Sequence, residues 1–290
     1  MSIELVRVVI ALVGSSIASY YDLFNNRNVP TIFSYSLIAI GLLLNIVTLD
    51  TGFLINSLGL VVLILIFGYL VYRMGQIGGA DVLLFVALAL LLPTAPPSLF
   101  KPADVPFNYP TIAFIFVLSG IIAIFGISLK YLPRVFKDIT MGEKIEVSGV
   151  QFFLSLTLAF IYIMFIVIVN TILQLSAITI AVLILIIICN SFLSMFKVHI
   201  ADRYMIRPVR VNEIDEEDVL AVEKMDADIV REFNLKKVLT KGEIEKLKKI
   251  KKIKEFPVYK DMPAFIPYVL MALILILVFG NPLAYVFWVG

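Results

Sequence analysis

The sequence of 290 residues contains little cysteine, histidine, tryptophan or charge. Its single cysteine, Cys189, excludes a disulfide scaffold, because it has no partner within the chain. Charged residues make up 16% of the chain, whereas a soluble globular domain has about 25%. This scarcity excludes an ordinary water-soluble enzyme. The 24 basic and 22 acidic residues nearly cancel to a net charge of +2, so the overall charge indicates no nucleic-acid partner.

Long hydrophobic runs dominate what is present: 61% of the residues are hydrophobic, and the mean hydropathy is +1.01. A spanning helix needs roughly 20 mainly apolar residues, because the hydrocarbon core of a bilayer is about 30 Å thick. Spans in lipid are helical, since open strand edges would leave backbone groups unpaired. The chain therefore predicts an all-α polytopic membrane protein with about eight transmembrane helices. The runs that carry them are 3–21, 28–49, 51–72, 82–100, 105–129, 147–196 (long enough for two helices) and 262–290.

The first run has a second interpretation. It includes the charged residues Glu4 and Arg7 near its start. The small residues Gly14, Ser15, Ser16 and Ala18 resemble the cleavage region of a secretory signal peptide. A cleaved signal peptide is therefore the alternative to a first transmembrane helix.

The basic residues predict the orientation of the chain. If the N-terminus is outside, the loops in the cytoplasm are 22–29, 73–80, 130–146 and 197–261. These loops contain every lysine and arginine except Arg7 and Lys101. Because cytoplasmic loops are enriched in basic residues, we expect a multi-pass protein of the cell membrane with both termini outside.

The only long hydrophilic segment, 197–261, divides the chain into a membrane domain at 1–196, a cytoplasmic domain at 197–261 and a last transmembrane helix at 262–290. We expect a small α+β fold for it. Thr240 and Glu243 are spaced as a capping box and predict the start of a helix. The stretch from Arg207 to Met225 is expected to supply short strands. His199 has no cysteine or histidine partner nearby, so we expect no metal site there.

The charge of this segment is sharply split. Residues 211–232 hold nine acids and two bases, whereas 236–254 hold nine lysines and two glutamates. Either the two halves neutralise each other, or the lysine-rich face lies on anionic membrane lipid and the acidic half is free to attract a basic ligand.

Three motifs are expected at the same cytoplasmic surface. Asp22 ends the first span, Gly78-Gly79-Ala80-Asp81 opens the fourth, and Pro263 and Pro267 open the last. Each has a purely structural explanation, as a charged flank, a helix N-cap or a helix-start proline. Together, two carboxylates from different helices can share a proton and hydrolyse a peptide bond. Glycines beside Asp81 would let a substrate backbone approach.

In the order and spacing of these motifs, the sequence resembles the archaeal type IV prepilin and preflagellin peptidases, which are GxGD-type membrane aspartic proteases. The resemblance covers about residues 10–100 and, more weakly, 207–268. The third position of the glycine motif is Ala80 here. The cysteine loop of the bacterial enzymes is missing, and the helix pair in 147–196 looks like an addition to a six-helix protease core.

The resemblance implies that the protein removes the short basic leader from pilin-like or archaellin precursors at the cytoplasmic membrane face. It implies Asp22 and Asp81 as catalytic residues, with Gly78, Gly79, Pro263 and Pro267 in substrate binding. No cofactor or metal is expected, and the partners are the precursor proteins and membrane lipids, not nucleic acid.

Two further hypotheses concern charge. Helix dipoles favour an ionised Asp81 at a helix start and a protonated Asp22 at a helix end. The acidic run 213–218 is expected to steer the basic leader towards the site.

Two other functions stay open at this point. A presenilin-like protease would cut within the membrane, although that family carries its aspartates later in the chain. A transporter would use the aspartates to bind a proton or a cation, but transport favours carboxylates near the bilayer midplane.

Overall fold

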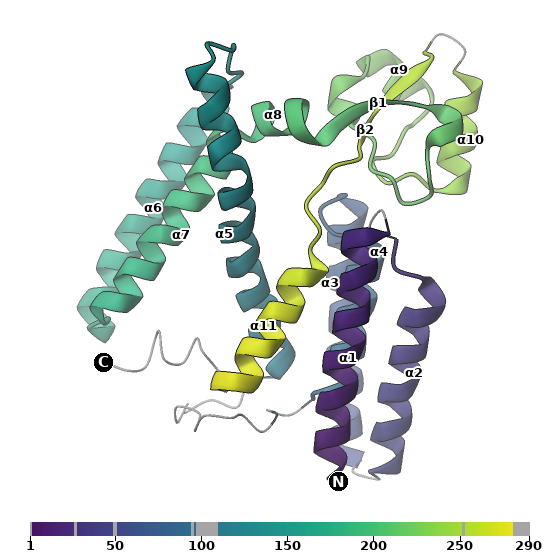
Figure 1. Ribbon diagram of the computed structural model, residues 1–290, viewed down its shortest axis with the longest axis vertical. Coiled ribbons are helices and arrows are strands. Elements are labelled where there is room, and N and C mark those ends of the chain that lie inside the picture. Colours follow the sequence, from purple (N-terminus) through teal and green to yellow (C-terminus); the bar gives the residue numbers. More distant parts are fainter. Residues whose placement is uncertain are drawn as a thin grey trace.

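A computed structural model describes residues 2–25, 28–48, 51–93, 96, 110–250 and 253–280 (Figure 1). Within these residues the protein is mostly helical, as predicted, with eight apolar helices and one small sheet. Helices α1, α5, α6 and α7 are long and apolar enough to span a membrane, whereas the apolar stretches assessed in α2, α3 (residues 57–73), α4 and α11 are shorter. The count of eight spans stays a prediction. The apolar helices are α1 Ile3–Phe24, α2 Thr31–Val47, α3 Thr51–Arg73, α4 Gly79–Leu91, α5 Thr111–Thr140, α6 Gly149–Leu173, α7 Ala177–Met195 and α11 Ile266–Phe279.

Two helix boundaries differ from the hydrophobic runs. Helix α4 ends at Leu91, well before the end of the run 82–100. Pro93 follows after the C-cap Leu92, and a proline disfavours helical backbone at the residue before it. Helix α5 starts after Pro110 and continues to Thr140, beyond the apolar run 105–129. Most of the connection between these helices, and residues 281–290 of the last predicted span, lie outside the described residues.

Helix α4 is the centre of the membrane core. Its residues from Val82 to Leu91 are almost all buried, as expected for a helix that is hydrophobic on every side. It packs against α1, α2, α3 and α5, and α11 closes the cluster against α1 and α5. Two glycines allow the close contacts: a methyl group at Gly41 would lie 2.8 Å from Leu90 Cβ, and one at Gly68 would lie 2.5 Å from Val82 Cγ1.

The small residues of α1 serve the same packing. Ala11, Ser15 and Ala18 are buried, and a methyl group at Gly14 would lie 2.6 Å from Leu37 Cδ1 of α2. Gly14 is therefore a contact position between α1 and α2, Ser15 and Ala18 are buried in the bundle, and Ser16 is exposed.

Arg7 explains why the first hydrophobic run contains a charge. Its guanidinium is buried and donates to Asn45 Oδ1 at 2.7 Å, to the Leu90 carbonyl at 3.1 Å and to the Leu44 carbonyl at 2.9 Å. These acceptors lie in the last turns of α2 and α4, where the helix dipole favours a cation. Arg7 thus joins three helices at the end of the bundle opposite to the sheet (Figure 1).

We expect Arg7→Met to destabilise the protein by about 2–4 kcal/mol, because it removes three hydrogen bonds that the buried guanidinium donates. The measurement is unfolding of the purified protein in detergent, followed by circular dichroism. Arg73→Met, at an exposed position, is the matched control and should change stability little. Equal stability of both variants would contradict this role of Arg7.

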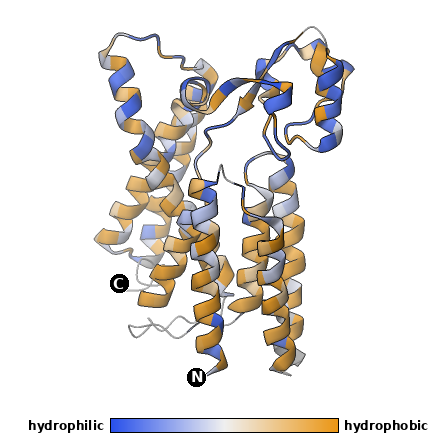
Figure 2. Cartoon of the chain, turned by 45° about the vertical axis from the view of Figure 1, so that its right-hand side comes forward, coloured by the Kyte–Doolittle hydropathy of each residue, from blue (hydrophilic) through white to orange (hydrophobic). Residues whose placement is uncertain are grey.

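The helix pair α6 and α7 stands outside the main core. The two helices pack on each other, and α7 packs on α5. Ser155 Oγ donates to the Ser191 carbonyl at 3.0 Å, and Ser128 Oγ of α5 donates to the Cys189 carbonyl at 3.4 Å. Large hydrophobic side chains cover the outer surface of α6, and Figure 2 shows the apolar helices separated from the hydrophilic part of the chain. This placement agrees with a hairpin beside a core of six helices.

The hydrophilic segment contains the small sheet. Strand β1, Ile206–Arg210, pairs antiparallel with β2, Glu255–Tyr259, so that Pro208 lies opposite Pro257. Helices α9, Ala227–Glu232, and α10, Lys241–Lys249, pack around it, with a separate hydrophobic cluster centred on Leu220, Leu239 and Phe256. The predicted α+β character is confirmed, although strand β2 lies in a stretch where no strand was expected.

The predicted capping box is wrong, although the helix does begin after Thr240. The Thr240 side chain makes no capping hydrogen bond. Glu243 is buried and instead accepts from the Lys236 backbone amide at 3.3 Å and from Lys246 Nζ at 2.8 Å. The Glu243 carboxylate therefore bonds to the preceding loop and not to the backbone amide of Thr240, as it would in a capping box.

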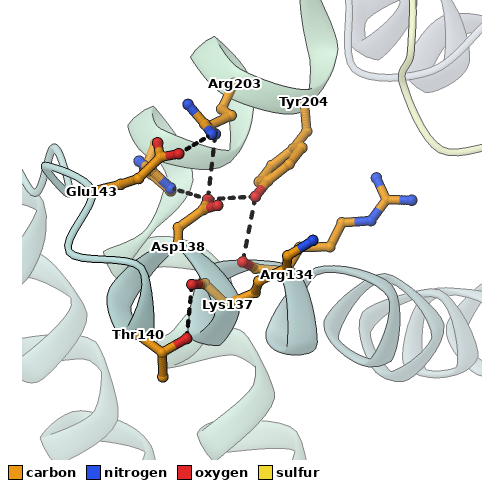
Figure 3. Close-up of polar contacts among 8 residues, drawn as sticks. Arg134, Lys137, Asp138, Thr140, Glu143, Arg203 and Tyr204 are labelled. Atoms are coloured by element: carbon orange, nitrogen blue, oxygen red, sulfur yellow. Dashed lines mark hydrogen bonds and ion pairs between the residues drawn. The ribbon is translucent and has the colours of Figure 1, made fainter.

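A polar cluster joins the hydrophilic segment to α5 (Figure 3). Asp138 is buried in the last turns of α5. Its Oδ2 lies 2.9 Å from His199 Nε2 in α8, Lys197–Ile200, and accepts from the Tyr204 hydroxyl. Arg203 lies nearby, with its Nε 3.6 Å from the same oxygen, and pairs with Glu143. His199, expected to be no metal ligand, is a hydrogen-bonding residue that fixes α8 to α5.

Candidate functional site

Asp22 lies in the last turn of α1, and its side chain is buried. Its Oδ2 accepts a hydrogen bond from the backbone amide of Ile266 at 3.0 Å. Ile266 is the first residue of α11, so its amide is one of the donors that a helix N-terminus leaves without a partner in the helix. Asp22 therefore joins the first and the last apolar helices.

Asp81 is the third residue of α4, and it is also buried. The residue in the N-cap position is Gly78, so the alternative in which Asp81 itself is the N-cap is wrong. Asp81 Oδ2 accepts from the Gly78 backbone amide at 2.8 Å. The carboxylate thus turns back over the glycine loop that precedes its helix.

The structure brings the two aspartates to the same end of the bundle, on helices that pack against each other. The Asp22 carboxyl is one of the charges that act on Asp81. An aromatic contact supports this arrangement: Phe85, one turn after Asp81, lies 6.2 Å from the Phe265 ring that precedes α11. Because the Phe265 backbone leads into Ile266, this contact holds the donor of Asp22 beside α4.

The helix-dipole hypothesis for the two protonation states overlooked α11. Asp22 does end α1, where the dipole disfavours a negative charge. It also faces the N-terminus of α11 through Ile266, where the dipole favours one. Each carboxylate accepts a hydrogen bond from a backbone amide at the start of a helix. The helix dipoles therefore do not indicate which aspartate is the protonated acid and which is the ionised base.

Neighbouring side chains lie close to the glycines of the loop that precedes α4. Gly75 adopts a positive φ of 71°, a conformation that side chains rarely allow. At Gly78, a methyl group would lie 3.3 Å from Asp81 Oδ2, so a side chain here would press on that carboxylate. At Gly79, a methyl group would lie 3.2 Å from Glu217 Oε1.

Glu217 reaches this loop from the hydrophilic segment. Its backbone has a positive φ of 71°, and its amide donates to the Leu239 carbonyl at 2.8 Å. A second contact lies beside it, because Val219 Cγ1 would be 3.0 Å from a methyl group at Gly75. The hydrophilic segment therefore covers the glycine loop at two points, and the Glu217 charge acts on Asp81.

Glu217 differs from its acidic neighbours in its partners. Asp215 and Asp218 pair with Lys260, and Glu216 pairs with Lys241. Among the described residues, no ion pair involves Glu217. Partial burial, and to a smaller extent repulsion from Glu216, raises the pKa of the Glu217 carboxyl. Glu217 thus stands as an uncompensated carboxylate over the glycine loop.

The two predicted proline positions have different places. Pro267 is in the first turn of α11, where a proline is tolerated because its missing amide has no partner in the helix. Pro263 is in the segment that leads from β2 to α11. Both flank Ile266, whose amide donates to Asp22. They therefore restrict the backbone that positions this donor.

Three features of the site could not be recognised from the sequence. The Ile266 amide carries no side-chain signal, so no pattern could point to it. Glu217 was included in the acidic run but could not be separated from its neighbours. In the sequence, Phe85 and Phe265 look like any other apolar residues. Their contact depends on how the residue before α11 packs against α4, which the sequence does not show.

The comparison with protein families now identifies the class. Residues 9–129, from α1 into α5, match the model of one peptidase family, and this segment carries both aspartates and the glycine loop. The family is the type IV leader peptidase family. The resemblance found from the motifs is confirmed at this level, over less than half of the chain. The search of curated proteins finds no match.

We expect Glu217→Gln to stabilise the protein at neutral pH. A raised pKa in the folded state means that ionisation of Glu217 costs folding free energy. Below the ordinary pKa of 4.5 the carboxyl is protonated in both states, so the variant and the parent should unfold alike. As the pH rises past the folded pKa, the parent should lose stability relative to the variant.

The measurement is the difference in unfolding midpoint between Glu217→Gln and the parent across this pH range. Glu232→Gln, at an exposed position of α9, is the control and should show no such divergence. A parent that gains stability over Glu217→Gln with rising pH would reveal a cationic partner and contradict the assignment.

Proposed function

We propose that the protein is a membrane aspartic endopeptidase that removes the short basic leader from pilin-like or archaellin precursors at the cytoplasmic membrane face, with Asp22 and Asp81 as its catalytic residues. The observation that carries the proposal is the pair of buried carboxylates at the ends of α1 and α4, within electrostatic reach of each other and inside the segment that matches the leader peptidases.

The chemistry needs one proton on the pair. One carboxylate is ionised and removes a proton from a water molecule, which attacks the scissile carbonyl carbon. The other carboxyl is protonated and donates its hydrogen bond to the carbonyl oxygen, where negative charge develops. The proton taken from water then passes to the leaving amine nitrogen as the peptide bond breaks. Because the two carboxyls titrate as a coupled pair, activity should follow a bell-shaped dependence on pH.

The glycine loop supplies the approach for a substrate. Side chains at Gly78 and Gly79 would crowd the Asp81 and Glu217 carboxylates, which lie 3.3 and 3.2 Å from the two methyl positions. With glycine at both positions, an extended peptide backbone reaches Asp81 once Glu217 has moved aside. Helix α11 and its start at Pro263 and Pro267 hold Asp22 from the opposite side through the Ile266 amide. In this proposal, the scissile bond lies between the loop and the start of α11.

The acidic surface above the site favours a basic leader. Glu217 lies over Gly79 without an ion-pair partner among the described residues, and the charges of Glu217 and Asp22 both act on Asp81. A cationic leader residue would relieve their mutual repulsion. We accordingly assign Glu217, within the run 213–218, as the acid that contacts the leader.

Asp22→Asn and Asp81→Asn should each lower the rate of cleavage by about 10³-fold or more, because neither amide can exchange the proton that the pair shares. The measurement is cleavage of a pilin-like precursor by the purified protein in detergent, with the cut located by mass spectrometry. Asp228→Asn, an exposed change, is the control.

Three outcomes decide this proposal. A cut just before the apolar segment of the precursor supports it, whereas a cut inside that segment favours a presenilin-like protease. Normal turnover by Asp22→Asn or by Asp81→Asn contradicts the catalytic pair.

Glu217→Gln should raise KM for a precursor with a basic leader about 10-fold while changing kcat little, since a charge-assisted contact contributes about 1.5 kcal/mol or more. Glu216→Gln removes the same charge one residue away and should raise KM less. The measurement is steady-state cleavage kinetics at low and high salt. Equal increases in KM for both variants would mean long-range steering only and would contradict a contact by Glu217.

A further inference from the structure

A cavity of about 590 Å³ lies where the hydrophilic segment meets the ends of the apolar helices. One wall is formed by Gln151 near the start of α6, by Lys197 in α8 and by Asp202 in the π-helical turn that follows. The opposite wall comes from the segment between 222 and 237, and from Tyr259 of β2. The cavity is distinct from the aspartate site, and none of the groups assigned to catalysis lines it.

The charge of the lining is positive. Four basic residues line the cavity, namely Lys197, Lys224, Arg231 and Lys237, against the two acids Asp202 and Glu223. Asp202 pairs with Lys224 through Oδ2, whereas its Oδ1 is buried and has no hydrogen-bond partner among the described residues. Glu223 accepts a hydrogen bond from the Tyr259 hydroxyl and keeps its negative charge. Within the described parts of the chain, Lys197, Arg231 and Lys237 have no ion-pair partner. The lining therefore holds three cations without an ion-pair partner and has a net charge of +2.

The position of the cavity at the ends of the apolar helices limits the kinds of ligand that it can bind. Helix α6 begins at Gly149 and α7 ends at Met195, so Gln151 and Lys197 mark the place where apolar helices pass into the hydrophilic part of the chain. Figure 2 shows the change from apolar to hydrophilic surface at this end of the helices. Apolar side chains also line the cavity, including Val198, Met225 and Val230. A ligand here would meet cations and hydrocarbon together.

We propose that this cavity binds the phosphate headgroup of an anionic phospholipid from the adjoining leaflet. Guanidinium and ammonium groups are the preferred protein partners of phosphate oxygens. Basic pockets at the cytoplasmic ends of membrane helices suit anionic headgroups, and basic residues near the surface add to the attraction. Lys197 comes from the helical part and Arg231 and Lys237 from the hydrophilic part, so a bound headgroup would bridge the two. The inference does not depend on the peptidase activity.

The test compares lipid retention by the full chain and by two triple variants of equal charge. The variant Lys197→Gln, Arg231→Gln, Lys237→Gln removes the three basic side chains of the lining that have no ion-pair partner among the described residues. The control Lys236→Gln, Lys248→Gln, Lys249→Gln removes three exposed lysines that do not line it. Each protein is purified from nanodiscs of phosphatidylcholine with phosphatidylglycerol, and retained lipid is measured by native mass spectrometry. Circular dichroism checks that each variant is folded.

The cavity variant should bind phosphatidylglycerol about a hundredfold more weakly than the parent, given the contribution of three basic residues near a membrane surface. The control variant should retain the lipid. Equal losses in both variants would mean general attraction of basic residues to the membrane and would overturn the proposal. Displacement of the lipid by millimolar inorganic phosphate, with the same loss in the cavity variant, would assign the site to a soluble phosphate compound instead.

Discussion

The hydrogen bond between the Ile266 amide and Asp22 is the contact on which the site depends, because it connects residues 244 positions apart in the chain. Asp22 is fixed by α1, and Ile266 begins α11 after the whole hydrophilic segment has been traversed. A buried carboxylate is costly without a donor, so α11 both satisfies Asp22 and closes the bundle beside α4. The glycine loop meets the same constraint for Asp81 through Gly78.

The hydrophilic segment takes part in this arrangement at two separate places. At one, Glu217 and Val219 lie on the glycine loop before α4. At the other, His199 and Tyr204 bind Asp138 at the end of α5. The segment is thus attached to the aspartate-bearing helices and also to the side of the bundle that carries α6 and α7. In the proposed function, a basic leader peptide would contact the charged residues of the hydrophilic segment before it reaches the proposed catalytic pair.

Much of this organisation follows from sequence, because hydrophobic runs and charged loops are direct consequences of a bilayer. Asp22 and the motif at Gly78 stand out since ionisable groups inside a bundle of apolar helices are rare. Helix ends were less predictable: Pro93 stops α4 inside its run, and Glu243 bonds to a loop instead of capping α10. The role of Ile266 could not be predicted, because a backbone amide gives no sequence signal and its contact spans the whole chain.

The most direct test of the central claim is a cross-link between positions 22 and 81. In a Cys189→Ser background the chain has no other thiol, so Asp22→Cys with Asp81→Cys can be joined by a short bis-thiosulfonate reagent and read by mass spectrometry. One shared pocket predicts an intramolecular link in the double variant and none in either single variant. Two thiols that each react with the reagent but never become joined would contradict a catalytic pair.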